Sequence, residues 1–196
     1  SSLAELDAAM TTADGTDNKA RLGANAIVGI SMAVARAVAG PGELFASLRP
    51  AGVSPRLPVP HFNVLNGGAH AANNLDFQEF MIAPIGAPSF PEAVRAGAGV
   101  YAALRGLLQE AGHATGLGDE GGFAPQIDRP EDVLTLLVRA IEAAGYTPGR
   151  DEVAIALDPA ASEFYRDGTY RVAGESLSSA EMIERYSQIV TDFPVW

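Results

Sequence analysis

Residues 57–83 read LPVPHFNVLNGGAHAANNLDFQEFMIA, and this stretch contains two strand signals. The first is the short apolar run Val59 to Leu65, which Asn66-Gly67-Gly68 closes with a turn. The second is the run Phe77 to Ile82. The stretch therefore predicts two short strands, with His70 in the loop between them.

Helices follow these strands, and they share one kind of start. Capping-box patterns occur at Ser89-x-x-Glu92, Asp128-x-x-Glu131 and Ser178-x-x-Glu181. Apolar residues recur at helical spacing after each of them. The patterns predict amphipathic helices that begin at these positions.

Strand signals lie between the last two predicted helices. The apolar run Val153 to Leu157 ends at Asp158, and the segment Glu163 to Val172 resembles a hairpin that turns at Asp167-Gly168. Apolar strands that alternate with amphipathic helices are typical of an α/β layer. The order of the elements predicts an α/β fold with a mainly parallel sheet.

The segment before residue 57 shows helical patterns and a linker, but no strand signal. Residues 1–12 and Gly23 to Val38 have apolar side chains at helical spacing, and Gly40-Pro41-Gly42 ends the second pattern. Residues 49–58 contain three prolines and a glycine, which indicates a linker. We expect a helical part over residues 1–50 and a separate domain over residues 57–196.

The composition excludes several classes of protein. The 196 residues carry a formal charge of −11, which argues against a general nucleic-acid or anionic-membrane surface. The absence of cysteine excludes a disulfide scaffold, a thiolate metal site and a cysteine nucleophile. The richest apolar stretch, Ala26 to Ala35, is too short for a membrane span, and the N-terminus has no secretory pattern. A soluble intracellular protein is the default expectation.

Acidic residues occur at two positions that could bind a ligand or take part in catalysis, a strand end and a glycine-rich loop. Asp158 ends a predicted buried strand, the position where ligands and metals bind in α/β folds, although it could also cap a helix. Gly118-Asp119-Glu120-Gly121-Gly122 places adjacent acids in a glycine-rich loop. One of them could be held protonated as a general acid, or the segment could be a solvated turn.

The first two strands supply further candidates. His70 follows two glycines that would let the backbone approach a ligand, but a histidine in a loop is also a common surface residue. Gln78 and Glu79 are neighbours in a strand, so their side chains should face opposite sides. Both could line one site only near the strand end or beside a bulge.

Five strings of sequence, taken together, resemble the enolase family in its order and at about its spacing. They are Leu22 to Ile27, Asn63 to His70, Gln78 to Pro84, Gly118 to Pro125 and Ala161 to Tyr165. The resemblance extends over nearly the whole chain.

The resemblance implies a fold. An enolase has an α+β N-terminal cap domain followed by an eight-stranded β/α barrel that opens strand-strand-helix-helix. Residues 1–50 would be the C-terminal helical part of the cap domain, and residues 57–196 the first, incomplete part of the barrel. The second strand of that barrel is antiparallel to the rest, which would place Gln78 and Glu79 at the catalytic mouth.

The resemblance also implies a glycolytic reaction, the Mg²⁺-dependent removal of water from 2-phosphoglycerate to give phosphoenolpyruvate. A lysine takes the proton beside the carboxylate, and a carboxylic acid protonates the departing hydroxide. By motif position Glu120 is similar to the family's acid and Glu79 supports it. The resemblance also implies that His70 would lie near the substrate, that Gln78 would contact the substrate, and that Asp158 would be a magnesium ligand.

Several features depart from the family pattern. The only lysine, Lys19, matches no catalytic lysine. Asp158 is followed by proline instead of a small polar residue or cysteine, and the segment from Val38 to Leu48 is shorter than the family's helix-to-loop connection. The chain resembles an internal fragment that lacks both ends of an enolase, and we expect it to be inactive alone.

Three interpretations stay open on the sequence. The first is part of a working enolase, which would be cytoplasmic and a homo-oligomer at full length. The second is a non-catalytic remnant that acts as a binding or structural module. The third is a different lyase of the enolase superfamily.

Overall fold

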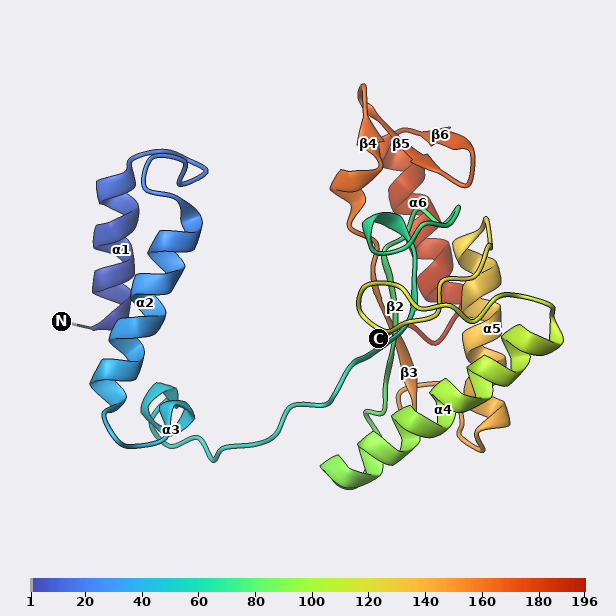
Figure 1. Cartoon of the computed structure of the whole chain (residues 1–196), viewed down its shortest axis with the longest axis horizontal. Helices are drawn as coiled ribbons and strands as arrows, with labels where there is room; N and C mark the ends of the chain where they lie inside the picture. The colour runs from blue at the N-terminus through green and yellow to red at the C-terminus, as the bar shows by residue number, and fades with distance from the viewer. Residues whose placement is uncertain (1) are drawn as a thin grey trace. The chain divides into compact units, whose positions relative to one another are not determined.

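The computed structural model describes residues 2–196. The chain divides into two compact units, one that reaches to Leu57 and one that runs from Pro58 to Trp196. Figure 1 labels the helices and strands of both units.

The first unit is helical. It contains α1 (Leu3–Asp14), α2 (Ala24–Ala39) and the short α3 (Leu44–Leu48). The two longer helices confirm the predictions for residues 1–12 and 23–38, whereas α3 was not predicted. A capping box between Ser2 and Glu5 starts α1, and Gly15 ends it in the left-handed conformation that glycine tolerates.

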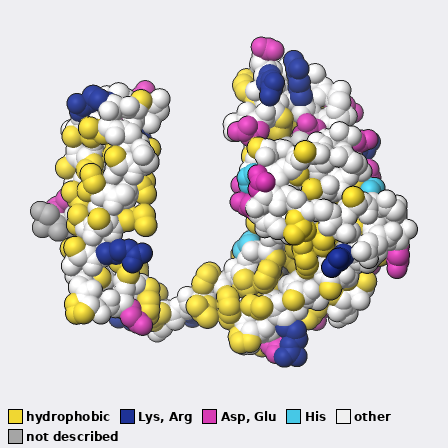
Figure 2. All heavy atoms as spheres, in the orientation of Figure 1, with side chains coloured by type: hydrophobic (Ala, Val, Ile, Leu, Met, Phe, Trp, Pro, Cys, Tyr) yellow, Lys and Arg dark blue, Asp and Glu magenta, His cyan; other side chains and the backbone are white. Residues whose placement is uncertain are grey.

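This unit buries few of its apolar side chains. Of its described residues only Asp14 and Ala35 are buried. Figure 2 shows hydrophobic side chains spread along the helices of this unit. Four large apolar side chains of α2 are exposed: Val28, Ile30, Met32 and Val38. The unit therefore has no sizeable core of its own.

The second unit is built on a sheet of β1 (Phe62–Asn66), β2 (Glu79–Ala83) and β3 (Ala154–Asp158), in that order. Both pairings are antiparallel. The prediction of a mainly parallel sheet was wrong for these strands, because β2 runs opposite to both of its neighbours. The antiparallel second strand is the feature that the enolase resemblance implied.

Helices pack against this sheet after the first two strands, so the unit opens strand-strand-helix-helix. They are α4 (Phe90–Glu110), α5 (Pro130–Ala143) and, after β3, α6 (Ser179–Asp192). Figure 1 shows α5 and α6 on the same side of the sheet, and Arg185 of α6 pairs with Glu131 of α5 at 2.8 Å. The observed order confirms an α/β architecture of the enolase type.

The predicted helix starts had different outcomes. Ser178 and Glu181 form a complete capping box, and the Ser89 side chain accepts a hydrogen bond from Glu92 N at 3.4 Å. The predicted cap at Asp128 was wrong, because Arg129 occupies the cap position of α5 without a side-chain bond. The Asp128 carboxylate instead accepts a hydrogen bond from Asn74 Nδ2 at 2.8 Å.

A small antiparallel sheet follows β3. It contains β4 (Tyr165–Arg166), β5 (Thr169–Val172) and β6 (Glu175–Leu177). The predicted turn at Asp167-Gly168 is confirmed, with φ of 53° and 83° at these residues. Positive φ at both central residues is typical of the tight turns that join twisted strands. The third strand of this sheet was not predicted.

The core of the second unit lies between the three-stranded sheet and its helices. Phe80, Ile82 and Ile155 of the sheet have no exposed surface, nor have Leu104 of α4 and Leu137 of α5. Among residues 2–196 no helix is both long and apolar enough to cross a membrane.

Candidate functional site

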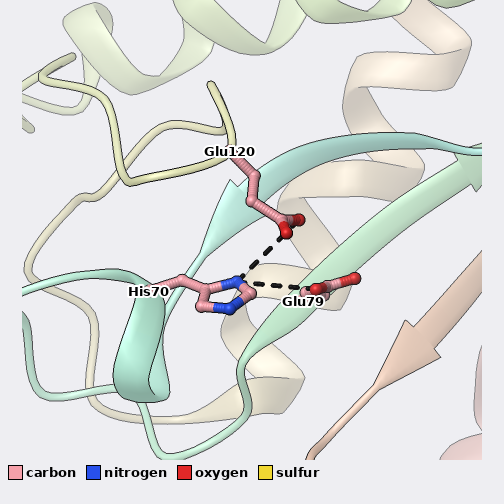
Figure 3. A group of neighbouring side chains, drawn as sticks. All are labelled: His70, Glu79 and Glu120. Carbon is pink, nitrogen blue, oxygen red and sulfur yellow. Dashed lines mark ion pairs between the residues drawn. The ribbon is translucent and has the colours of Figure 1, made fainter. Parts of the chain in front are cut away.

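Side chains from separate segments converge at one end of the β1–β2–β3 sheet. His70 ends the short 3₁₀ helix η1 (Gly68–His70), Glu79 begins β2, and Glu120 lies in the loop after α4. His70 Nδ1 lies 3.5 Å from Glu79 Oε1 and 3.8 Å from Glu120 Oε2. Figure 3 shows both carboxyl groups facing the same nitrogen of the imidazole ring. The structure thus brings three of the predicted site residues into contact.

Close backbone packing brings the His70 loop to this position. The pairing of β1 with β2 sets Asn66 opposite Glu79, and Gly67 N donates to Gln78 O at 2.9 Å. A Cβ at Gly67 would overlap the Phe77 carbonyl, so this approach requires glycine. The glycines that the sequence marked as a turn therefore position His70 against the start of β2.

Asp158 lies beside this group. It ends β3 directly opposite Glu79 in the antiparallel register, and its side chain is exposed. Its Oδ1 accepts a hydrogen bond from Ala160 N at 3.0 Å, whereas the residue that caps the following 3₁₀ helix η2 (Ala161–Glu163) is Ala160. Asp158 therefore does not cap this helix.

Gln78 lies at the same end of the sheet but outside the cluster. It is half-buried and immediately precedes β2, and its backbone carbonyl is used by Gly67. Its side chain makes no hydrogen bond within residues 2–196. The structure therefore leaves the Gln78 amide available and assigns it no partner.

Sequence reasoning missed Asn63, which contacts the cluster directly. Its Nδ2 donates to Glu120 Oε2 at 3.0 Å, across 57 positions of sequence. The pairing of β1 with β2 shifts register between Asn63 and Leu65, which is a bulge. A polar residue inside an otherwise apolar strand was the available signal.

The environment separates the pKa values of the two glutamates. Burial, the charge of Glu120 and a hydrogen bond to it raise the pKa of Glu79, with a smaller contribution from Asp158. The hydrogen bond from Asn63 lowers the pKa of Glu120, with help from His70. When one proton is shared between the pair, these environments favour its residence on Glu79.

The glycine-rich loop separates its two acids. Asp119 N donates to His70 O at 3.0 Å, which holds the loop against η1. Only the second acid, Glu120, is in the group of side chains around His70. The loop is therefore a built part of this site and not simply a solvated turn.

Comparison with known proteins gives this geometry a family context. The profile described as "Enolase, C-terminal TIM barrel domain" matches residues 54–196, and the profile "Enolase, N-terminal domain" matches residues 1–45. The chain belongs to the enolase family.

Full-length enolases are much longer than this chain. It is 52% identical over 191 residues to the enolase of Beutenbergia cavernae, covering 97% of the chain and 45% of that enolase. It is also 52% identical over 191 residues to the enolase of Acidothermus cellulolyticus, covering 44% of that protein. The chain therefore spans less than half the length of these relatives.

The donor set of the site bears on which metal it suits. Mg²⁺ prefers oxygen ligands in octahedral geometry and commonly binds through one or two carboxylates. The exposed Asp158 carboxylate has an oxygen free of hydrogen bonds within residues 2–196 and fits such an ion. His70, Glu79 and Glu120 could also surround an ion, with ligand atoms within 4.8 Å of one another, but an imidazole nitrogen suits transition metals better than Mg²⁺.

Proposed function

We propose that this chain contributes part of the active site of an enolase, a lyase that reversibly dehydrates 2-phosphoglycerate to phosphoenolpyruvate with Mg²⁺. The observation that carries the proposal is the convergence of His70, Glu79 and Glu120 from separate segments. Family membership supports the reaction, and the contacts support the roles proposed below.

The carboxyl pair accounts for the acid that the reaction needs. The departing hydroxide must receive a proton to leave as water. Glu79 holds a proton readily because burial and the nearby Glu120 charge raise its pKa. Glu120 is the more exposed member, with 47% of its side chain accessible against 16% for Glu79. We assign delivery of the proton to Glu120 and its storage to Glu79.

The remaining predicted residues bind and orient. His70 lies against both carboxyl groups, where its ring can donate to an anionic substrate. We expect the Gln78 amide to contact the same substrate. Asp158 would hold one Mg²⁺, which when bound offsets negative charge on the substrate.

The base for the substrate carbon is the part that this chain does not supply. Its only lysine, Lys19, lies in the helical first unit, where Nζ donates to Asp17 O at 3.2 Å. We therefore propose that the chain alone has no enolase activity and requires the segments that complete its relatives. In that complete form we expect a cytoplasmic homo-oligomer.

A chimera tests the proposal. This chain would replace the matched 191 residues of the Beutenbergia cavernae enolase, and phosphoenolpyruvate formation would be followed with and without Mg²⁺. We expect Mg²⁺-dependent turnover by the chimera and none by the isolated chain. Glu120→Gln should lower kcat by roughly 10²-fold or more, the usual contribution of a general acid.

A matched variant controls for the loss of one negative charge. Glu110→Gln removes an exposed carboxylate at the end of α4 and should leave kcat unchanged. A folded chimera that is inactive would overturn the catalytic proposal and favour the non-catalytic module. Turnover by the isolated chain would overturn the requirement for further segments.

A further inference from the structure

The loop that carries Glu120 is short and rich in glycine, so it needs external supports. Three of the five residues Gly118 to Gly122 are glycine. Gly121 has a φ of 82°, and a Cβ there would meet no atom within 4 Å. Glycine gives a chain more conformational freedom than any other residue. The position of the Glu120 carboxylate therefore depends on what holds the loop.

Backbone hydrogen bonds hold the two ends of this loop. Asp119 N donates to His70 O at 3.0 Å, and Phe123 N donates to Val64 O at 3.0 Å. Within the loop, Gly118 N donates to Gly122 O at 2.8 Å and Gly121 N to Gly118 O at 3.2 Å. These bonds close the loop, but none of them uses the carbonyl of Gly121, the residue after Glu120.

Tyr101 of α4 supplies a donor for this carbonyl. Its hydroxyl donates to Gly121 O at 2.8 Å, one residue after Glu120. Its ring stacks on Phe123, with centroids 4.4 Å apart and planes 13° apart, and Phe123 is 2% exposed. The buried ring of Phe123, the residue after Gly122, therefore holds the Tyr101 ring and its hydroxyl in place.

We propose that Tyr101 is a positioning residue, which fixes the Gly118–Gly122 loop and thereby orients the Glu120 carboxylate toward Asn63, Glu79 and His70. The catalytic part of this inference rests on the proposed function, while the effect on the loop does not. Burial also raises the pKa of Tyr101, so the hydroxyl keeps its proton and donates across the neutral range.

A purely structural role for the ring makes a different prediction. If only the aromatic stack matters, Tyr101→Phe would preserve it and nothing would change. If the hydroxyl holds the loop, the same substitution frees the Gly121 carbonyl while the ring still packs on Phe123. The phenylalanine variant therefore separates the two roles.

The first experiment is hydrogen exchange on the 196-residue chain. Tyr101→Phe should speed exchange of the Gly118, Asp119 and Gly121 amides about five- to tenfold, the effect of losing one ordinary hydrogen bond. Tyr165→Phe is the matched control, because the Tyr165 hydroxyl makes no hydrogen bond within residues 2–196. Unchanged exchange in Tyr101→Phe, or unprotected loop amides in the parent chain, would overturn the proposal.

The second experiment uses the chimera described above. Tyr101→Phe should lower kcat on the order of tenfold, with KM within about twofold, because misplacing a catalytic group weakens the chemical step more than binding. An altered KM with unchanged kcat would contradict positioning of Glu120. An inactive parent chimera would count against the proposed function, while the exchange data would still decide whether Tyr101 holds the loop.

Discussion

Asn63 Nδ2 donates to Glu120 Oε2 at 3.0 Å, so a neutral side chain of β1 orients the carboxylate of a loop 57 positions away. The amide carries no charge and does not titrate, so this hydrogen bond persists across the pH range in which Glu120 is ionised. The Asn63 carbonyl oxygen is buried without a partner in the described residues, so the Nδ2 group is the part of this side chain in use.

We predict that Asn63→Ala raises the pKa of Glu120 toward its ordinary value. A hydrogen bond to the ionised form of a carboxyl group lowers its pKa, and this bond is the largest cause of the shift at Glu120. NMR titration of the Glu120 side-chain carboxyl carbon measures the change directly.

A second asparagine–carboxylate pair provides the control. Asn74→Ala removes a comparable hydrogen bond to Asp128, 2.8 Å long, and should leave the Glu120 titration as it is in the parent. Equal titration of Glu120 in the parent and in Asn63→Ala would refute the role given to Asn63.

We predict that Glu79→Gln makes the folding stability of the chain fall less as pH rises. The raised pKa of Glu79 means that folding disfavours its ionised form. Its contribution to stability is therefore greatest below the unfolded value of about 4.3 and falls as pH rises through the higher folded value. Glutamine mimics the neutral acid and does not titrate.

Urea unfolding at a series of pH values checks this prediction. As pH rises from the unfolded pKa of Glu79 to its higher folded pKa, the unfolding free energy of Glu79→Gln should increase relative to that of the parent. Above the folded pKa the difference should stay constant. Glu110→Gln, which removes one exposed charge, should show no such growth. A gap between Glu79→Gln and the parent that is constant with pH would contradict the assignment.

We predict that Gly97→Ala destabilises the second unit by about 1–3 kcal/mol, the usual cost of overpacking a core. Gly97 is buried on α4, and an added Cβ would lie 2.5 Å from the ring of Phe62 on β1. The Phe62 ring would have to shift to make room for the added methyl group. Urea unfolding measures the loss.

The same helix offers the matched control. A Cβ at Gly99 would meet nothing within 4 Å, so Gly99→Ala should stabilise the unit by about 0.5–1 kcal/mol through helix propensity alone. Similar effects of the two substitutions would show that the contact with Phe62 does not limit packing.

The sequence predicted most of the elements that position the site, because each has a local cause. The apolar runs of β1 and β3 and the capping box at Ser178 were readable from neighbouring residues alone. The prediction of a cap at Asp128 failed, and in the structure the Asp128 carboxylate accepts a hydrogen bond from the distant Asn74 instead. Local patterns do not reveal such a distant partner.

The same limit applies to the site. His70, Glu79 and Glu120 were candidates from their local patterns, and the family resemblance gave them their expected roles. The register of β1 against β2 brings His70 to Glu79, and the bond from Asp119 N to His70 O brings the Glu120 loop to both. Asn63 and Tyr101 were missed because a bulge and a helix–loop contact bring them to Glu120. Both relationships depend on the folded backbone, which no spacing within the sequence reveals.

The last prediction concerns the first unit, where acid should loosen the segment between α1 and α2. Asp14 is 1% exposed, and its carboxylate accepts hydrogen bonds from the Thr16 hydroxyl, from Thr16 N at 3.1 Å and from Leu22 N at 2.6 Å. These bonds, led by the one from the Thr16 side chain, lower the pKa of Asp14. Its stabilising contribution is therefore present above the unfolded value of about 3.9 and is lost as pH falls through the lower folded value.

Asp14→Asn should reproduce the acid effect at neutral pH, because one acceptor oxygen becomes an NH₂ group that opposes an existing donor. Exchange of the Leu22 amide should be faster in this variant than in the parent near pH 7, and the two rates should converge once Asp14 is protonated in the parent. Asp17→Asn changes an exposed acid of the same segment and should leave the Leu22 amide unaffected. If Asp17→Asn speeds Leu22 exchange as much as Asp14→Asn does, general charge in the segment, and not the Asp14 hydrogen bonds, governs its opening.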